Sequence, residues 1–300
     1  MIKELHEMLE VAGIDSTELQ RLVDLSLAED LRFGPDVTSE ATIPVGQEAE
    51  GEVVARQPGI VCGVTVALVV LEAVQFPRSG VTIIHEDGDA VEAGDAVLHL
   101  SGPLRPLLLA ERTLLNFMTH MSGIATATNS WVRALEGTSC AVRDTRKTTP
   151  GLRQIEKYSV RRGGGTNHRM GLGDAALIKD NHIAAAGGIT RAVTAIRSAN
   201  PDISLEVECD TLEQVREAIS IQCSLILLDN MDVDTIRAAV EIARRSPAVR
   251  VEASGGMTLE NARAVARAGV DYIAVGSLTH SAASLDLGLD IVPTTPTANS

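Results

Sequence analysis

Residues 203–230 read ISLEVECDTLEQVREAISIQCSLILLDN. Two aliphatic runs in this stretch, Ile203–Glu208 and Leu225–Asp229, predict β-strands, and the amphipathic segment Leu212–Ser220 between them predicts a helix. Two strands joined through a helix by short connections are typical of a parallel sheet. This stretch therefore predicts an α/β fold in which neighbouring strands run in the same direction.

The same alternation continues on both sides of this stretch. Further strands are predicted at Cys140–Asp144, Ala175–Asp180, Val249–Ala253 and Tyr272–Val275. Further helices are predicted at Ile189–Ala199, Val233–Arg245 and Leu259–Ala268. Strand and helix units that follow one another in this way favour a parallel α/β barrel. Because six strands can be counted rather than eight, we expect an open, incomplete barrel instead of a closed eight-stranded one.

The first hundred residues have a different, mixed pattern. Helices are predicted at Thr17–Leu31, with Thr17 as a candidate N-cap, and at Val64–Val74. Strands are predicted at Glu50–Arg56, Val81–His85 and Ala96–Leu100. A further helical pattern, Pro103–Leu135, has a predicted break near Ser122-Gly123 and links the two parts of the chain. We expect residues 1–115 to form an α/β sandwich domain, 116–277 the open barrel catalytic domain, 278–290 a segment that packs back on the sandwich, and 291–300 a flexible tail.

Composition limits the location and the class of the protein. The amino-terminal residues mix charges with no apolar stretch behind them, which argues against a secretory signal. The longest apolar run, Ile60–Val74, is interrupted by Gly63 and Glu72 and is too short to span a bilayer. The four cysteines lack the spacing of a metal site or of a disulfide framework. We expect a cytoplasmic protein that does not associate with membranes and holds no structural zinc.

The positive charge of this acidic chain gathers in one segment. The formal net charge is −14, yet residues 143–179 contain nine Lys or Arg residues against three acids. A solvated helix face is one interpretation of this run. A second is an anion-binding site, because Thr148–Gly151 and Gly163–His168 break helices and leave backbone N–H groups available. The net charge, and Tyr158 as the only aromatic residue of the segment, argue against nucleic acid.

Polar residues follow each predicted strand of the barrel. Barrel enzymes place their chemistry at the carboxyl ends of their strands. These ends carry Asp144–Lys147, Lys179–Asn181, Glu206–Glu208, Asp229–Asn230, Glu252–Gly256 and Gly276–Ser277. Alternate residues of a strand face the same way, so Glu206 and Glu208 share a face, as do Glu252 and Ser254. A structural ion-pair network of Lys179 with Glu206 and Glu208 remains an alternative to a ligand site.

The glycines and acids at these ends indicate the kind of ligand. Ser254-Gly255-Gly256 precedes a helix predicted to begin near Thr258, and Gly276-Ser277 follows the last strand. Backbone N–H groups at such places bind phosphate. Carboxylates suit ribose hydroxyls or hydrated Mg²⁺, and the cationic segment suits carboxylates or pyrophosphate. The combination indicates a phosphorylated sugar and a polyacid.

Several blocks of sequence resemble one known family. The central blocks are RDTRKTTPGLR at 143–153, GGGTNHRMGL at 163–172 and LIKDNH at 177–182, and shorter blocks are GPDVT at 34–38, ERTLLN at 111–116, EVE at 206–208, LDN at 228–230, ASGG at 253–256 and VGS at 275–277. They resemble the signature blocks of the quinolinate phosphoribosyltransferases, the decarboxylating glycosyltransferases also called nicotinate-nucleotide pyrophosphorylases (carboxylating). The resemblance extends over nearly the whole chain. Thr149 and Thr166 are mild departures at uncharged positions.

The resemblance implies a fold, an assembly and a reaction. It implies an amino-terminal sandwich domain, an open seven-stranded barrel and a homodimer whose active sites form across the interface; association of the dimers into a higher oligomer stays open. It also implies that quinolinate and 5-phosphoribosyl 1-diphosphate (PRPP) are converted into nicotinate mononucleotide, pyrophosphate and CO₂ in de novo NAD biosynthesis, with Mg²⁺ as the cofactor. Two alternatives stay open. One is an enzyme on the same scaffold with another substrate, as in the related molybdenum-transport-associated proteins, and the other is a non-catalytic anion-binding protein.

The resemblance also implies a role for individual residues. The positions that resemble quinolinate ligands are Thr145, Arg146, His168, Arg169 and Lys179, together with Arg112 donated by the partner subunit. Those that resemble phosphate-binding positions are Ser254, Gly255, Gly256, Gly276 and Ser277. The positions that resemble catalytic residues are Lys147, Glu208 and Asp229. Lys147 corresponds to a lysine close to the reacting centre, and the two acids correspond to groups that bind the ribose hydroxyls and Mg²⁺, either directly or through water. For His168 a purely structural, hydrogen-bonded role is the alternative. Arg153, Lys157, Arg161 and Arg162 are expected to be solvated or interfacial helix charges.

Overall fold

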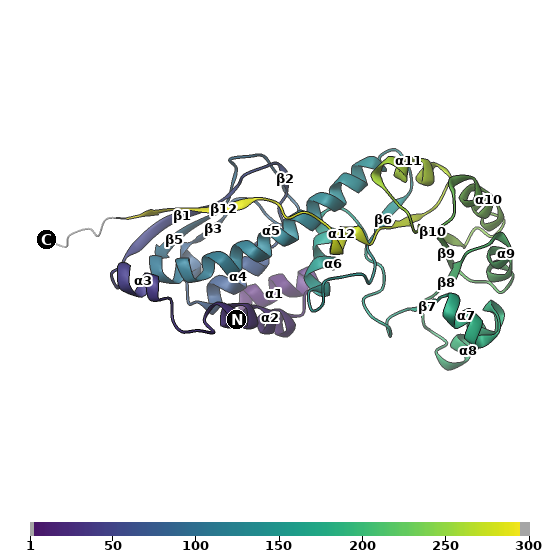
Figure 1. The fold of residues 1–300 in the computed structure, drawn as a ribbon, viewed down its shortest axis with the longest axis horizontal. Coiled ribbons are helices and arrows are strands. Elements are labelled where there is room, and N and C mark those ends of the chain that lie inside the picture. Colours follow the sequence, from purple (N-terminus) through teal and green to yellow (C-terminus); the bar gives the residue numbers. More distant parts are fainter. Residues whose placement is uncertain (1–2, 295–300) are drawn as a thin grey trace. The chain divides into compact units, whose positions relative to one another are not determined.

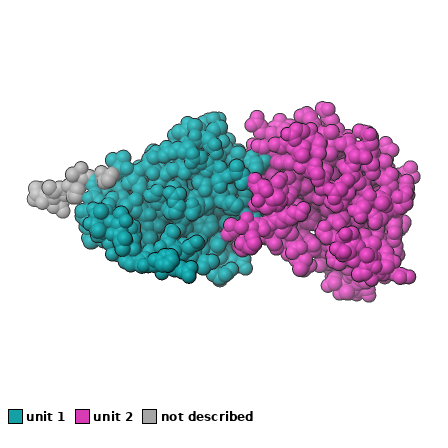
Figure 2. Space-filling model, viewed as in Figure 1, with its two compact units in different colours: residues 1–127, 154–164, 282–300 teal, residues 128–153, 165–281 magenta. Residues whose placement is uncertain are grey.

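The chain folds into two compact units. The structure is a computed structural model that describes residues 3–294. Unit 1 comprises residues 1–127, 154–164 and 282–300, and unit 2 comprises residues 128–153 and 165–281 (Figure 2). Among the described residues, no helix combines the length and the apolar character that crossing a bilayer requires.

Unit 2 is built on one parallel sheet. Its strands are β6 (Ala141–Arg143), β7 (Ala176–Ile178), β8 (Leu205–Cys209), β9 (Leu225–Asp229), β10 (Arg250–Ser254) and β11 (Tyr272–Ala274). They lie in the order β6-β11-β10-β9-β8-β7, and every pair is parallel. Between residues 3 and 294 no ladder joins β6 to β7; the free edge of β6 makes one isolated bridge, Arg143 to Thr166. The expected open barrel is therefore confirmed, with six paired strands instead of the seven that the resemblance implies.

Helices form the outer layer of unit 2 around these strands (Figure 1). They are α7 (Asp180–Ala186), α8 (Ile189–Ala199), α9 (Leu212–Ser220), α10 (Val233–Ala243), α11 (Leu259–Arg267) and the short α12 (Ser277–His280). Each of α9, α10 and α11 begins at a side-chain cap: Thr211 accepts from Gln214 N–H, Asp232 from Thr235 N–H, and Thr258 from Asn261 N–H. These caps fix where each helix begins, and hence how long the loop after each strand is.

The sheet buries apolar and acidic residues together. Val207, Ile226 and Ala253 are fully buried, as expected for parallel strands that are covered on both faces. Glu206 and Glu252 are also buried, at 4% and 0% exposure. Because burying a carboxylate without a partner is costly in free energy, the contacts of these two carboxylates indicate the role of this part of the sheet.

Unit 1 contains a four-stranded antiparallel sheet covered by helices. The strands are β1 (Glu48–Ala55), β3 (Val81–Ile83), β5 (Ala96–Pro103) and β12 (Leu287–Pro293), in the order β12-β1-β5-β3, and the small pair β2 (Gly59–Ile60) and β4 (Ala90–Val91) lies apart from them. The helices are α1 (Lys3–Ala12), α2 (Ser16–Asp30), α3 (Val37–Thr42), α4 (Val64–Ala73) and the 3₁₀ turn η1 (Arg78–Gly80). Residues Val64 to Leu71 of α4 are all buried, so α4 lies within the apolar core of this unit.

Two helix predictions are wrong. Helix α5 (Leu104–Ala134) runs without the expected break at Ser122-Gly123. A Cβ on Gly123 would lie 2.2 Å from the Ala283 carbonyl oxygen, so the glycine allows another segment to approach the helix and does not end it. Helix α2 is capped by Asp15, whose carboxylate accepts from the N–H groups of Thr17 and Glu18; Thr17 lies inside the helix.

The two units also depart from the expected boundaries. Residues 154–164, expected in the barrel, belong to unit 1 as most of α6 (Arg153–Arg162). The Tyr158 hydroxyl donates to Asp87 at 2.8 Å, and the Glu156 carboxylate lies 3.0 Å from the His120 ring. Strand β12 pairs with β1 and continues to Pro293, three residues into the segment expected to be a flexible tail, whose residues 295–300 lie outside the described residues.

Candidate active site

One pocket of unit 2 collects most of the predicted site residues. Its volume is about 600 Å³, and it opens at the carboxyl ends of the strands. Predicted residues that line it are Thr145, Arg146, Lys147, His168, Arg169, Lys179, Glu208, Asp229, Ser254, Gly255 and Gly256. The other lining residues had no assigned role: Asn230 and Glu252 were expected only among the polar residues at strand ends, and Leu177, Leu227 and Ala274 were not predicted. The rule that barrel strands present chemistry at their carboxyl ends thus located the pocket.

Three predicted residues lie outside this lining. Arg112 is an exposed residue of α5 in unit 1. Gly276 lies beside the pocket wall, where an added Cβ would come within 3.1 Å of Lys147 Cδ and 3.4 Å of Thr145 Oγ1. Ser277 is the first residue of α12.

Two arginines give the pocket its anion-binding character. Arg146 follows β6, and Arg169 belongs to the loop between α6 and β7. Within residues 3–294, the Nε atoms of both side chains are buried and lack a hydrogen-bond acceptor. Burial, followed by repulsion from Arg146, lowers the pKa of Arg169. Two guanidinium groups that repel each other and keep unused donors are stabilised by a bound anion.

Arg153 holds the loops that carry these arginines. Its guanidinium donates to Thr148 Oγ1 at 3.0 Å, to the Met170 carbonyl at 3.0 Å and to the Arg146 carbonyl at 3.4 Å. Of the two expected roles, a solvated or an interfacial helix charge, the solvated one is wrong for Arg153, which is half-buried, and for Lys157, which is fully buried. Five donors in a rigid fork suit this kind of loop clamp.

The acidic wall of the pocket comes from β8 and β9. The Lys179 ammonium forms an ion pair with the Glu208 carboxylate, and Glu208 is buried. Asp229, at the end of β9, accepts from the Asn230 side-chain amide at 2.6 Å. These carboxylate oxygens are of the kind that Mg²⁺ prefers. Glu208 and Asp229 are the residues that could hold a hydrated Mg²⁺, whose remaining oxygens would come from water or a phosphate, although Lys179 already occupies part of the Glu208 carboxylate.

The turn after β10 has no room for a side chain at Gly255. Gly255 has φ +81°, and a Cβ there would lie 2.2 Å from Asn230 Oδ1 and 2.9 Å from Asn230 N. Gly256 follows with φ +59°, just ahead of the Thr258 cap of α11. Left-handed backbone before a helix start turns N–H groups toward a ligand, as phosphate sites require.

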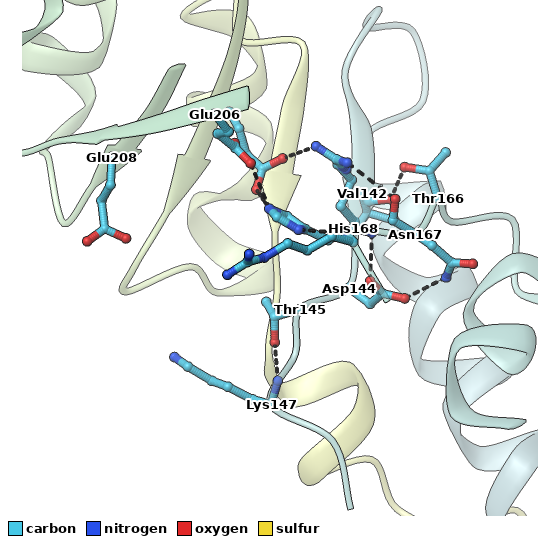
Figure 3. Close-up of polar contacts among 12 residues, drawn as sticks. Val142, Asp144, Thr145, Lys147, Thr166, Asn167, His168, Glu206 and Glu208 are labelled. Atoms are coloured by element: carbon cyan, nitrogen blue, oxygen red, sulfur yellow. Dashed lines mark hydrogen bonds and ion pairs between the residues drawn. The ribbon is translucent and has the colours of Figure 1, made fainter. Parts of the chain in front are cut away.

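The sequence interpretation missed a buried cluster around His168 and Glu206 (Figure 3). His168 Nε2 lies 2.9 Å from Glu206 Oε2 and 3.6 Å from Glu252 Oε1, and Arg143 Nη1 lies 2.5 Å from Glu252 Oε2. Burial, and then the neighbouring Glu206, raise the pKa of Glu252 to about 7. Glu206 thus contacts His168, so the alternative network of Lys179 with both Glu206 and Glu208 is wrong for Glu206.

A signal for this cluster was present in the sequence. Strand alternation places Glu206 on the same face as Glu208, and Glu252 on the same face as Ser254. Two acids on the inward face of a barrel sheet need buried partners. The strand order β10-β9-β8 brings them to one end, and sequence alone did not show that Arg143 and His168 would meet them there.

Comparison with known proteins agrees with this geometry. Residues 36–122 match the model of the quinolinate phosphoribosyl transferase N-terminal domain, and residues 124–290 match that of the C-terminal domain. The chain belongs to the quinolinate phosphoribosyltransferase family.

Relatives in this family match nearly end to end. The chain is 51% identical over 269 residues to the nicotinate-nucleotide pyrophosphorylase (carboxylating) of Mycobacterium leprae, covering 89% of this chain and 94% of the relative. It is 44% identical over 278 residues to a probable nicotinate-nucleotide pyrophosphorylase (carboxylating) of Bacillus subtilis, covering 91% and 93%. The solved nicotinate-nucleotide pyrophosphorylase of Francisella tularensis matches with a TM-score of 0.88 at 37% identity, covering 93% of this chain and 98% of the other.

Proposed function

We propose that this protein transfers the 5-phosphoribosyl group of PRPP to quinolinate, with loss of CO₂ and pyrophosphate, to give nicotinate mononucleotide in NAD biosynthesis. The observation that carries the proposal is a single pocket with unused guanidinium donors, a carboxylate pair at the ends of two strands and a glycine turn ahead of a helix. Family membership and the names of the relatives support the same reaction.

The side of the pocket that carries Arg146 and Arg169 suits the two carboxylates of quinolinate. Quinolinate has two adjacent carboxylates, and planar guanidinium groups bind such groups through two parallel hydrogen bonds. Arg146 and Arg169 offer this geometry, with Thr145, His168 and Lys179 beside them. Nicotinate, with one carboxylate, would leave one arginine without its anion. The pocket therefore favours quinolinate over a monocarboxylate acceptor.

The acidic wall suits the transfer step. As the bond between ribose C1 and the pyrophosphate oxygen breaks, positive charge develops on the sugar, and the pyridine nitrogen forms the new bond to C1. Glu208 and Asp229 supply negative charge on the ribose side of the pocket. Both residues would hold a hydrated Mg²⁺, which when bound neutralises the leaving pyrophosphate. Lys147, exposed in the pocket wall, adds positive charge on the leaving-group side.

Decarboxylation follows from the charge on the product. Once ribosylated, the pyridinium ring carries a positive charge, so the electron pair left at C2 when CO₂ departs is stabilised by the ring nitrogen, and C2 then takes a proton. The residues of the pocket have to position the ring and neutralise its carboxylates. The 5-phosphate is assigned to Ser254, Gly255 and Gly256, with Gly276 and Ser277 at the neighbouring loop.

The proposal includes a cytoplasmic homodimer that can associate further. Arg112 is an exposed arginine within the family block at residues 111–116, and its charge suits donation to the quinolinate site of a partner subunit. A mixture of Arg112→Ala and Lys147→Ala chains tests this arrangement, because some heterodimer sites would be intact. Activity should reappear on mixing two inactive variants; no recovery, after chain exchange has been verified, would contradict the shared site.

The reaction is tested with a coupled assay for nicotinate mononucleotide, in which quinolinate and nicotinate are compared in the presence of PRPP and Mg²⁺. The proposal predicts product from quinolinate with one CO₂ released per turnover, and little product from nicotinate. Equal use of nicotinate would identify a different acceptor specificity. Binding without turnover of either compound would favour a non-catalytic anion-binding protein.

A further inference from the structure

The ring of His168 is engaged at both nitrogens. Nδ1 accepts the backbone N–H of Arg169 at 2.8 Å, and Nε2 lies 2.9 Å from Glu206 Oε2. A backbone N–H can only donate, so Nδ1 carries no proton. The ring proton is therefore on Nε2 and is donated to the Glu206 carboxylate (Figure 3). His168 is thus a neutral imidazole whose N–H already has an acceptor.

The acids behind His168 keep the proton on Nε2. Glu206 accepts it directly, and Glu252 Oε1 lies 3.6 Å from the same nitrogen. Arg143 balances Glu252 through its ion pair at 2.5 Å, and it stacks on the Tyr272 ring at 4.7 Å. In this surrounding the tautomer with the proton on Nδ1 would turn a lone pair toward two carboxylates, which is unfavourable.

The loop that carries Arg169 is held on its other side as well. The Asp144 carboxylate accepts the His168 backbone N–H at 2.8 Å and the Asn167 side-chain amide at 2.5 Å. Arg143 also donates to the Asn167 carbonyl at 3.3 Å. Residues 167–169 are therefore fixed by buried groups, while the Arg169 side chain extends into the pocket with an unused Nε donor.

We propose that Glu206 is a positioning residue for the substrate site: by accepting the Nε2 proton of His168 it fixes the tautomer that holds the Arg169 backbone, so that Arg169, and not His168, binds a substrate carboxylate. This inference rests on the proposed function for the identity of the anion. It gives Glu206, Glu252 and Arg143 a role in supporting the substrate site. Of the two roles that the sequence left open for His168, ligand or hydrogen-bonded support, it selects the support.

A metal ion is a weaker explanation of the same cluster. Ligand atoms of His168, Glu206 and Glu252 lie within 4.8 Å of one another, which is close enough for a bound ion. A metal at Nε2 would need that nitrogen without its proton, whereas the hydrogen bond from Arg169 to Nδ1 places the proton there. Arg143 already neutralises Glu252. The geometry is that of a hydrogen-bonded support.

The experiment combines kinetics with ¹⁵N NMR of histidine-labelled enzyme. Glu206→Ala removes the acceptor, Glu206→Gln keeps an oxygen that can accept from Nε2, and Glu241→Ala on the exposed surface of α10 is the control. We expect Glu206→Ala to raise the KM for quinolinate about tenfold or more and the KM for PRPP less than about twofold. Glu206→Gln should recover most of the difference, and the control should match the wild type.

The spectrum reads the tautomer without relying on turnover. The His168 signals, assigned by their loss in His168→Asn, should show an unprotonated Nδ1 and a protonated Nε2 in the wild type, unchanged when quinolinate is added. In the spectrum, a protonated Nδ1, or a second ring proton on adding quinolinate, would overturn the proposal. In the kinetics, it would be overturned if Glu206→Gln behaved like Glu206→Ala, or if Glu206→Ala raised the KM values for quinolinate and PRPP equally. Absence of wild-type turnover would instead overturn the proposed function, while the tautomer could still be measured.

Discussion

Arg143 and Arg146 lie three residues apart and have opposite environments. Arg143 is paired with Glu252, donates to the Asn167 carbonyl and stacks on Tyr272. Arg146 lines the pocket, and its Nε has no acceptor among the described residues. Both contribute equally to the positive charge of the segment. The comparison teaches that unsatisfied hydrogen-bond donors, and not charge itself, distinguish an arginine that is available to bind an anion from one that supports the site.

The largest expected effect on stability comes from breaking the buried pair. Arg143→Leu leaves Glu252 buried without its guanidinium, so that it must either stay an uncompensated carboxylate or take up a proton, and removing one partner of such a pair costs about 3–5 kcal/mol. Urea unfolding should show this loss. Arg216→Leu is the control, because Arg216 pairs with Glu213 at the surface and its loss should cost less than about 0.5 kcal/mol. Similar losses of unfolding free energy in both variants would show that the buried pair contributes no more to stability than the surface pair.

The reverse pattern is expected at Arg146. Arg146→Ala should leave the free energy of unfolding nearly unchanged, because the side chain has an unused donor in the free protein. Its kcat/KM for quinolinate should fall about 100-fold, equivalent to roughly 3 kcal/mol, as expected when one side of a charged hydrogen-bonded pair is removed. Steady-state kinetics and urea unfolding of the same preparation check both statements. Near-normal use of quinolinate would remove Arg146 from the site.

A smaller effect is expected in the pH dependence of stability. Burial beside Glu206 raises the pKa of Glu252 from 4.5 to about 7. Between these values the unfolded chain releases the Glu252 proton and the folded chain retains it, so the stability contributed by this group falls as pH rises from about 4.5 to about 7. The loss is on the order of 1–3 kcal/mol. Glu252→Gln should remove it, and an unchanged pH slope of the unfolding free energy in that variant would contradict the assignment.

The smallest effect is expected at the loop clamp. Arg153→Lys keeps the charge but cannot reach Thr148 and the carbonyls of Arg146 and Met170 together. The KM for quinolinate should rise about threefold to tenfold, with little change in the KM for PRPP. Competition kinetics with a pyridine dicarboxylate measure the same shift. If Arg153→Lys kept the wild-type KM for quinolinate, the loops would hold their positions without the contacts of Arg153.

The sequence predicted the scaffold and the mouth of the pocket well, for a physical reason. Strand and helix periodicity, together with polar residues at strand ends, are local signals, and they led to Arg146, Lys179 and Glu208, whereas Arg169 was identified through the family resemblance. Pairing across the sheet is not local. Whether Glu206 meets Lys179 or His168 depends on how the loop after α6 folds over the end of β6, and that path is set by Asp144, Arg143 and the bridge to Thr166.

The misjudged helix residues have the same origin. Ser122-Gly123 has the composition of a break, yet the Ser122 hydroxyl accepts from the Cys62 N–H at 2.8 Å and Gly123 admits the Ala283 carbonyl. Arg153 and Lys157 have the composition of a solvated face, yet Arg153 clamps two loops and Lys157 is buried. Tertiary contacts overrode local preference at each of these positions.

The most direct test of the central contrast is calorimetric titration of quinolinate and of nicotinate into the wild-type protein and into Arg146→Ala. If the unused donors of Arg146 and Arg169 form the dicarboxylate site, quinolinate should bind the wild type about 100-fold more tightly than nicotinate, and Arg146→Ala should abolish most of that preference. Equal affinity for the two compounds in the wild type, or an unchanged preference in the variant, would contradict the account.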